Sequence, residues 1–172
     1  TFSASYNSAS ATGSVNSYSD MGIKFVPEAL DGLSMGYAMG EHDESTSGTG
    51  NTATDVTGLD TSVLWVKYAF GAVTVGYQES EVDGPTTTQD DDSTAMSISY
   101  AISDDLSVSY GTHELDLGSA TDAGTDQESS GISASYTMGG TTISAAFNET
   151  DNIAGVAAND EESMEIALVF AF

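Results

Sequence analysis

Apolar side chains occupy every second position through most of this chain, and small polar side chains lie between them. The segment from Ile132 to Met138, Ile-Ser-Ala-Ser-Tyr-Thr-Met, shows the pattern. Successive side chains of an extended strand point to opposite faces, whereas an amphipathic helix needs apolar residues three and four positions apart. No window of the sequence has convincing helical spacing. The sequence therefore predicts an all-β protein with almost no helix.

Ten strands are expected from this alternation, each with one apolar and one small polar face. Their approximate ranges are residues 1–9, 17–26, 33–42, 59–70, 72–82, 93–102, 106–116, 131–138, 141–150 and 162–172. Boundaries inferred in this way are accurate to about two to four residues. In the ninth segment, Ile143 and Phe147 lie on the apolar face, and Ser144 and Asn148 lie on the polar face.

Short and long connections alternate strictly along the chain. The short ones are residues 27–32, 71, 103–105 and 139–140, and the long ones are residues 10–16, 43–58, 83–92, 117–130 and 151–161. This parity predicts an up-and-down antiparallel meander with all tight turns at one end. A soluble β-sandwich has no need of such parity. A transmembrane β-barrel requires it, because its periplasmic turns are short, its outer loops are long and its outer surface is apolar.

The chain ends on a strand whose apolar face finishes with Phe170 and Phe172. Such an exposed strand would promote aggregation in water, but its apolar face suits a lipid bilayer. Aromatic residues also lie near the short-turn ends of other strands, and a second group lies about five residues further along, as in the interfacial belts of membrane barrels. The first group is Phe25, Phe70, Tyr100, Tyr136 and Phe172, and the second is Tyr37, Tyr77, Tyr110 and Phe147.

Charge and cysteine content exclude several classes of function. The chain has 27 acidic and two basic residues, a formal net charge of −25, so it cannot assemble the basic patch that binds nucleic acid. It has no cysteine, which excludes disulfides, thiolate metal sites and cysteine nucleophiles. Most acidic residues fall near the long loops, so we expect a negative outer rim that concentrates cations and gives a cation-preferring pore.

Two hairpins and the terminal aromatic residue carry a family resemblance. The hairpins are residues 95–111, with a tight Ser-Asp-Asp turn, and residues 132–147. Together with Phe172 they resemble the carboxyl-terminal part of a Gram-negative general porin, most of all the acidic porins of alphaproteobacteria. The resemblance implies a 16-stranded, usually homotrimeric, water-filled channel of the outer membrane for passive diffusion of small hydrophilic solutes and ions. It implies no enzymatic activity.

The same resemblance implies partners for the outer surface and for the last strand. Outer-membrane lipid and lipopolysaccharide would surround the barrel. Phe170 and Phe172 would form the signal that the outer-membrane assembly machinery reads.

The sequence is compatible with two kinds of barrel. The ten strands either belong to a wider barrel or close into a complete ten-stranded one. Ser, Thr, Gly and Ala dominate the inward faces, and such small side chains would fill a ten-stranded barrel poorly. The start at Thr1, in mid-pattern and without a leader, favours a fragment. We therefore expect residues 1–172 to form one transmembrane barrel domain whose amino-terminal strands are absent.

Candidate pore-lining residues are the larger polar side chains on the inward faces. They are Asp20, Lys24, Lys67, Gln78, His113 and Asn148. A lysine at the lipid midplane costs about 2–4 kcal/mol, so both lysines are expected to point inward. They would either screen solutes or form structural ion pairs, Lys24 with Asp20 for example. For Lys67 the pattern alone does not distinguish the two faces, because the apolar residues Val63 and Trp65 share its face.

Two acidic triplets in the long loops are candidates for calcium binding, since Ca²⁺ prefers six to eight oxygen ligands. They are Asp90, Asp91 and Asp92, and Asp160, Glu161 and Glu162. Neither has the spacing of a defined calcium loop, so solvated acidic loops are the simpler interpretation, and no other cofactor is expected.

Two other functions stay open. One is a secreted acidic β-rich adhesin or surface-layer module. The other is an outer-membrane protease that uses His42 and His113, although no motif supports it.

Overall fold

A computed structural model describes residues 1–7, 16–45, 56–119 and 125–170, which form ten strands. The first five are β1 (Phe2–Asn7), β2 (Asn16–Phe25), β3 (Leu33–Ser45), β4 (Val56–Phe70) and β5 (Val73–Asp83). The others are β6 (Asp91–Ala101), β7 (Leu106–Leu117), β8 (Gln127–Met138), β9 (Thr141–Asp151) and β10 (Glu161–Phe170). Two single 3₁₀ turns, η1 (Thr87–Gln89) and η2 (Ile153–Gly155), lie in the connections after β5 and β9.

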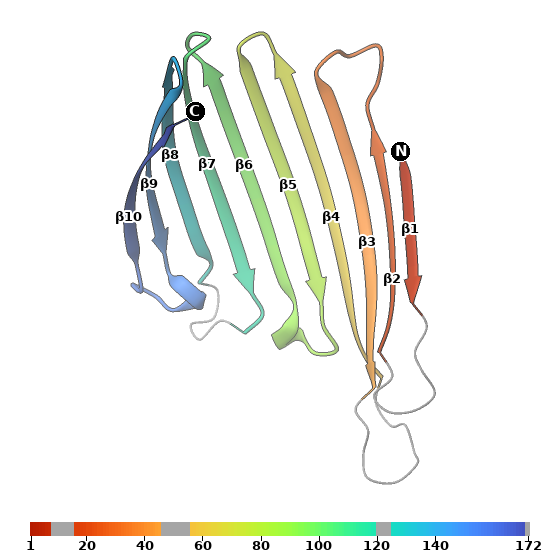
Figure 1. Ribbon diagram of the computed structural model, residues 1–172. Helices are drawn as coiled ribbons and strands as arrows, with labels where there is room; N and C mark the ends of the chain where they lie inside the picture. Colours follow the sequence, from red (N-terminus) through yellow and green to blue (C-terminus); the bar gives the residue numbers. More distant parts are fainter. Residues whose placement is uncertain (8–15, 46–55, 120–124, 171–172) are drawn as a thin grey trace.

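All ten strands lie in one antiparallel sheet in the order of the sequence, from β1 to β10 (Figure 1). The predicted meander is therefore confirmed. The alternation located every strand, but it placed the starts of β4 and β8 three and four residues late, at residues 59 and 131 instead of Val56 and Gln127. The described residues contain no helix long and apolar enough to cross a membrane.

The turns after β2, β4, β6 and β8 lie at one end of the sheet, and the described longer connections, after β5 and β9, lie at the other (Figure 1). The turn between β4 and β5 uses Gly71 at φ 57°, and the turn between β8 and β9 uses Gly139 at φ 61°. Glycine adopts this left-handed region at no steric cost, which is why it occupies such short turns. The described connections thus alternate between the two ends as predicted, but the predicted difference in length is not strict, because the connection after β2 (residues 26–32) is as long as that after β5 (residues 84–90). The predicted long connections at residues 10–16, 43–58 and 117–130 lie partly outside the described residues.

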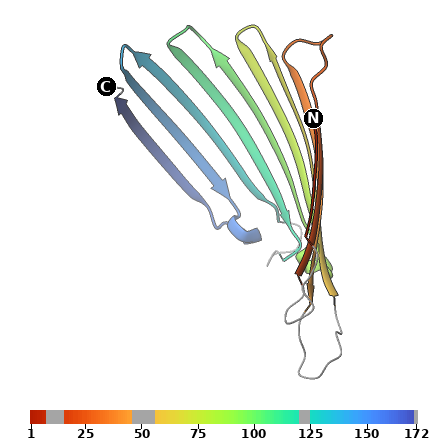
Figure 2. The same cartoon turned by 45° about the vertical axis from the view of Figure 1, so that its right-hand side comes forward.

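The sheet is curved and open (Figure 2). Within the described residues, β1 pairs only with β2 and β10 pairs only with β9. The two edge strands do not pair with each other, so the described strands do not close into a ten-stranded barrel.

The distribution of exposure is the reverse of that in a soluble protein. No hydrophobic side chain in the described part of the chain is buried. On β8, Ile132, Tyr136 and Met138 are 56%, 44% and 68% exposed, whereas the alternate residues Ser133 and Ser135 are only half-exposed. We call these two sides the apolar face and the polar face. Because side chains crowd on the inside of a curve, the polar face lies on the concave side of the sheet.

Candidate functional site

Cross-strand hydroxyl pairs line the polar face. Ser80 and Ser93 lie 2.8 Å apart between their oxygens, and Ser109 and Ser133 lie 2.7 Å apart. Near the short turns, the hydroxyl oxygens of Thr137 and Thr142 lie 3.0 Å apart, and near the long loops Thr150 donates to Ser129 at 3.1 Å. A hydroxyl has one donor and two acceptor positions, so each pair keeps hydrogen-bonding capacity for water. The polar face is therefore a wettable wall of small side chains.

The strand register places all six predicted pore-lining residues on this polar face. Asp20 and Lys24 come from β2, Lys67 from β4, Gln78 from β5, His113 from β7 and Asn148 from β9. Directly opposite residues of antiparallel strands share a face. Lys24 lies opposite Gly36, which lies opposite Trp65, which in turn lies opposite Gln78.

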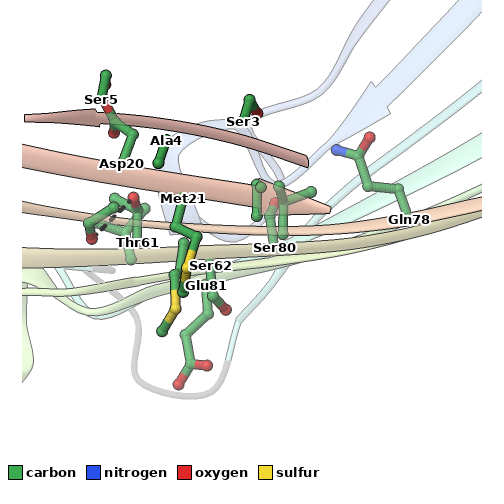
Figure 3. Close-up of a pocket in the computed structure, with 16 residues that line it drawn as sticks. Ser3, Ala4, Ser5, Asp20, Met21, Thr61, Ser62, Gln78, Ser80 and Glu81 are labelled. Atoms are coloured by element: carbon green, nitrogen blue, oxygen red, sulfur yellow. Dashed lines mark hydrogen bonds between the residues drawn. The ribbon is translucent and has the colours of Figure 1, made fainter. Parts of the chain in front are cut away.

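Glycines on the polar face leave room for longer neighbouring side chains. A Cβ added to Gly40 would lie 2.8 Å from Oδ1 of Asp20 and 2.9 Å from Oγ1 of Thr61. Asp20 also accepts a hydrogen bond from the Ser5 hydroxyl at 2.9 Å. These residues line a hollow of about 510 Å³ across β1 to β5 (Figure 3).

The two faces of the sheet can be followed at this hollow. In Figure 3, Ser3 and Gln78 project to one side of the strands, and Met21 and Glu81 project to the other. The inner wall of the hollow is formed by alternate residues of neighbouring strands and combines polar side chains with Val63 and Val82.

Trp65 is the residue that the sequence pattern left ambiguous. Val63, Leu64, Trp65 and Val66 make both faces of β4 apolar at this point. The register with β3 and β5 places Trp65 on the polar face, where the Lys24 ammonium lies 5.7 Å from the centre of the indole ring. Lys67, two residues further on, lies on the same face. In the sequence, the only sign that Trp65 lies beside the lysines on the polar face is its spacing of two residues from Lys67.

The two histidines do not form a catalytic pair. His42 lies on β3, opposite Leu59, and His113 lies on β7, opposite Ala95. Three strands separate β3 from β7. The arrangement gives no support to the predicted protease alternative.

Acidic residues gather on the apolar-face side, beyond the apolar stretch of each strand and toward the long loops. In four rows, carboxylates lie directly opposite one another on neighbouring strands. The rows are Glu41–Asp60–Asp83, Glu81–Asp92–Asp116, Glu114–Glu128–Asp151 and Glu149–Glu162. Like charges in directly opposite positions destabilise a sheet. The sequence predicts the negative rim, but not that these rows lie on the same side of the sheet as the apolar face, which we also call the outer side.

The first acidic triplet proposed for calcium does not converge. Asp90 accepts a hydrogen bond from the Gly84 backbone N–H at 2.9 Å, and Asp91 accepts one from the Gly118 N–H at 3.3 Å. Asp92 lies on the outer side, in the acidic rows. Successive strand residues point to opposite faces, so Asp91 and Asp92 on β6 diverge.

The second triplet diverges in the same way. Asp160 accepts a hydrogen bond from the Asn152 N–H at 3.1 Å, whereas Glu161 and Glu162 lie on opposite faces of β10. The described ranges hold no group of three or more His, Asp or Glu residues placed to bind a metal ion. Calcium binding stays an untested prediction.

The structure describes one of the two residues of the predicted assembly signal. Phe170 ends β10, with its side chain 53% exposed on the apolar face. Phe172 lies outside the described residues.

Comparison with known proteins gives one family. A family model described as Gram-negative porin matches residues 1–172, the full length of the chain. No match is found among curated proteins.

Proposed function

This chain belongs to the Gram-negative porin family, which forms channels in the outer membrane, and on that premise we propose that its polar face lines a water-filled pore for passive diffusion of small hydrophilic solutes and ions. The observation that carries the proposal is the two-sided sheet. Its exposed side is apolar, its concave side is lined by small hydroxyl-bearing residues, and the described part of the chain has no hydrophobic core. A secreted adhesin or surface-layer module would have to bury these apolar side chains.

Further strands are part of this proposal. The outer edges of β1 and β10 carry backbone groups without strand partners in the described residues, and lipid offers no hydrogen bonds to such groups. We therefore propose that the sheet is the ten-stranded part of a wider barrel, of 16 strands as in general porins, and that three copies assemble into a trimer. Cross-linking in the native membrane tests the oligomeric state, and a monomeric product would contradict the trimer.

Cation preference is supported by the charges near the pore. Among the polar-face side chains that the structure describes, Asp20, Asp91, Glu161 and Glu165 are acidic and Lys24 and Lys67 are basic. The acidic rows on the outer side add a field that physiological salt screens beyond about 8 Å. The net effect favours cations at the pore mouth.

Reversal potentials in a potassium chloride gradient test this preference. Glu165→Gln removes a polar-face charge, and Glu162→Gln is the matched control on the outer side. We expect the first to reduce cation preference more than the second. Anion selectivity of the unaltered channel would contradict the proposal.

The acidic rows also suggest how the outer surface meets its membrane. They begin where the apolar face ends, at the level where phosphate-bearing head groups of lipopolysaccharide would lie. Opposed carboxylates and phosphates repel each other unless divalent cations lie between them. We propose that calcium or magnesium ions bridge this surface to lipopolysaccharide. Removal of divalent cations by a chelator should then reduce the lipopolysaccharide that co-purifies with the protein, and an unchanged amount would contradict the bridge.

The carboxyl-terminal strand is proposed to guide assembly. Phe170 presents an exposed aromatic ring on the apolar face, and the outer edge of β10 has no strand partner in the described part of the chain. Deletion of Phe170 to Phe172 should lower the amount of assembled protein without changing its synthesis. Equal assembly would contradict the role.

Cysteine modification tests the pore itself. The 172 residues contain no cysteine, so a single introduced thiol reports on one position. Ser99 lies on the polar face and its neighbour Ile98 lies on the apolar face. We expect a bulky water-soluble thiol reagent to lower the single-channel conductance of Ser99→Cys and to leave Ile98→Cys unchanged. Equal effects, or the absence of any conductance in planar bilayers, would refute the porin mechanism.

A further inference from the structure

The only tryptophan of the chain and its only two basic residues lie together on the polar face. Lys24 lies opposite Gly36, and Gly36 lies opposite Trp65. Lys67 follows Trp65 on the same face of β4, and the Lys24 ammonium is 5.7 Å from the indole centre. In a chain with 27 acidic residues, this is a local concentration of positive charge around an aromatic ring.

Gly36 fixes the position of the indole. A Cβ added at Gly36 would lie 2.6 to 2.8 Å from three indole atoms of Trp65, including Nε1. Gly36 is itself buried. The indole therefore lies against the backbone of β3, while the half-exposed side chain keeps part of its surface open to the concave side of the sheet.

Trp65 and Lys67 also border a hollow of about 600 Å³ on the polar face, which we call the indole hollow. Gly76, Ala95 and Gly111 form its floor. This volume lies within the range of small-molecule sites, which combine an apolar surface with a few polar groups that fix orientation.

Polar groups surround the indole hollow. Gln78, opposite Trp65 on β5, contributes an exposed amide. Ser97, Ser99 and Ser109 contribute hydroxyls.

The two ammonium groups are not used in ion pairs. Among the residues that the structure describes, neither Lys24 nor Lys67 lies within ion-pair distance of a carboxylate, and the predicted pair of Lys24 with Asp20 is not formed. Charge-assisted hydrogen bonds to carboxylates are among the stronger polar contacts in proteins. The Lys67 ammonium at the hollow is thus available to a mobile anion, and the Lys24 ammonium, which lies over the Trp65 ring, keeps its positive charge unneutralised.

We propose that the indole hollow binds a small carboxylate that carries a ring, such as a sugar acid or an aromatic acid. The ring lies on the part of the Trp65 indole that borders the hollow, and the carboxylate accepts a hydrogen bond from Lys67. The Lys24 ammonium over the indole adds positive charge beside the hollow. The Gln78 amide and serine hydroxyls contact the remaining polar groups. A plain inorganic anion would use only the lysines. The inference rests on the proposed function only in requiring that solutes reach the polar face.

Fluorescence of Trp65 tests the inference without any transport measurement. The protein purified from outer membranes is titrated with glucuronate, benzoate, glucose or chloride at constant ionic strength. The signal is the part of the emission that a Trp65→Phe variant lacks. We expect a saturable change with glucuronate or benzoate, and the one that binds more tightly identifies the ring type. No saturation with either acid, or an equal response to chloride, would overturn the proposal.

Variants separate specific binding from general charge effects. Lys67→Gln keeps the indole and should weaken binding of the carboxylate about tenfold or more, the usual effect of losing a hydrogen bond to a charged group. Ser144→Asp, on the same face but on β9, changes the charge of the polar face by the same one unit; it is the control and should bind normally. Folding of each is checked by heat-dependent electrophoretic mobility. Equal affinities for Lys67→Gln and the control would refute the site. A conducting channel without carboxylate binding would overturn this inference and leave the porin function intact.

Discussion

The free-energy cost of a lysine should differ between the two faces of the sheet, and substitutions on the two sides of one strand measure this difference. Ala134 and Ser135 are adjacent small residues in the middle of β8. Ala134 lies on the apolar face, opposite Val108 and Ala145, and Ser135 lies on the polar face, opposite Ser107 and Ser144. The substitutions Ala134→Lys and Ser135→Lys therefore differ only in the side that receives the charge.

The position of Ala134 sets the size of the effect. Met138 at the turn lies four positions after it, and Ser130, the first polar residue on that side beyond Ile132, lies four positions before it. At about 3.3 Å per residue, it lies about 13 Å along the strand from either limit. A lysine at this depth costs about 2–4 kcal/mol, which lowers the ratio of folded to unfolded protein about 30-fold to 1000-fold. Ser135→Lys faces water and should change stability by about 0.5 kcal/mol or less.

Urea unfolding in phospholipid vesicles, followed by electrophoretic mobility and circular dichroism, measures both variants. We expect Ala134→Lys to unfold at much lower urea than Ser135→Lys. Equal costs, or a greater cost for Ser135→Lys, would refute the assignment of the two faces.

The packing of the indole, the repulsion in the acidic rows and the apolar length of β10 can each be tested separately. Gly36→Ala should displace the Trp65 indole and shift its fluorescence emission to the red. Gly76→Ala is the control, because its Cβ would meet only the Ser97 hydroxyl oxygen, and it should leave the emission unchanged. Identical emission spectra for the two variants would contradict the packing of the indole against Gly36. Glu128→Gln, in the middle of the row from Glu114 to Asp151, should stabilise the protein by about 0.2–1 kcal/mol. It should also reduce the stabilisation that added calcium gives, and the midpoints of urea unfolding measure both effects. A destabilised variant would contradict the repulsion between the carboxylates of this row. The apolar outer residues of β10 run from Met164 to Phe170, about 20 Å along the strand. Because hydrophobic mismatch costs free energy, folding yields should be higher in vesicles of short-chain lipids than in vesicles of long-chain lipids. Higher yields in thick bilayers would contradict this prediction.

The sequence predicted most of the fold because each strand repeats a strong local signal. On β9, for example, Ile143 and Phe147 alternate with Ser144 and Asn148, and this pattern has one interpretation. On β4 the signal fails, since Val63 and Trp65 are as apolar as Leu64 and Val66. Only the pairing of Trp65 with Gly36 and Gln78 shows which side it occupies.

Acidic residues show a second limit of prediction from sequence. Asp91 and Asp92 are neighbours in the sequence, but strand geometry separates their side chains onto two faces. The repulsive rows, by contrast, join residues that are distant in sequence, such as Glu41 and Asp83. Composition predicted the charge of the rim, but only the register of the strands shows where that charge lies.

The absence of buried hydrophobic side chains in the described strands has a consequence for how this protein tolerates mutation. In a globular protein, truncation of a core residue leaves a cavity, and the cost depends on how well the neighbouring atoms collapse. In the proposed barrel, an apolar side chain that lies outside the subunit contacts borders fluid lipid, which fills any space that a smaller residue leaves. Substitutions at separate positions should therefore add independently, with costs set by transfer between water and lipid. Such a surface can accumulate many replacements among apolar residues. The free-energy cost of each replacement depends on the hydrophobicity of the side chain and its depth in the bilayer, and not on its shape.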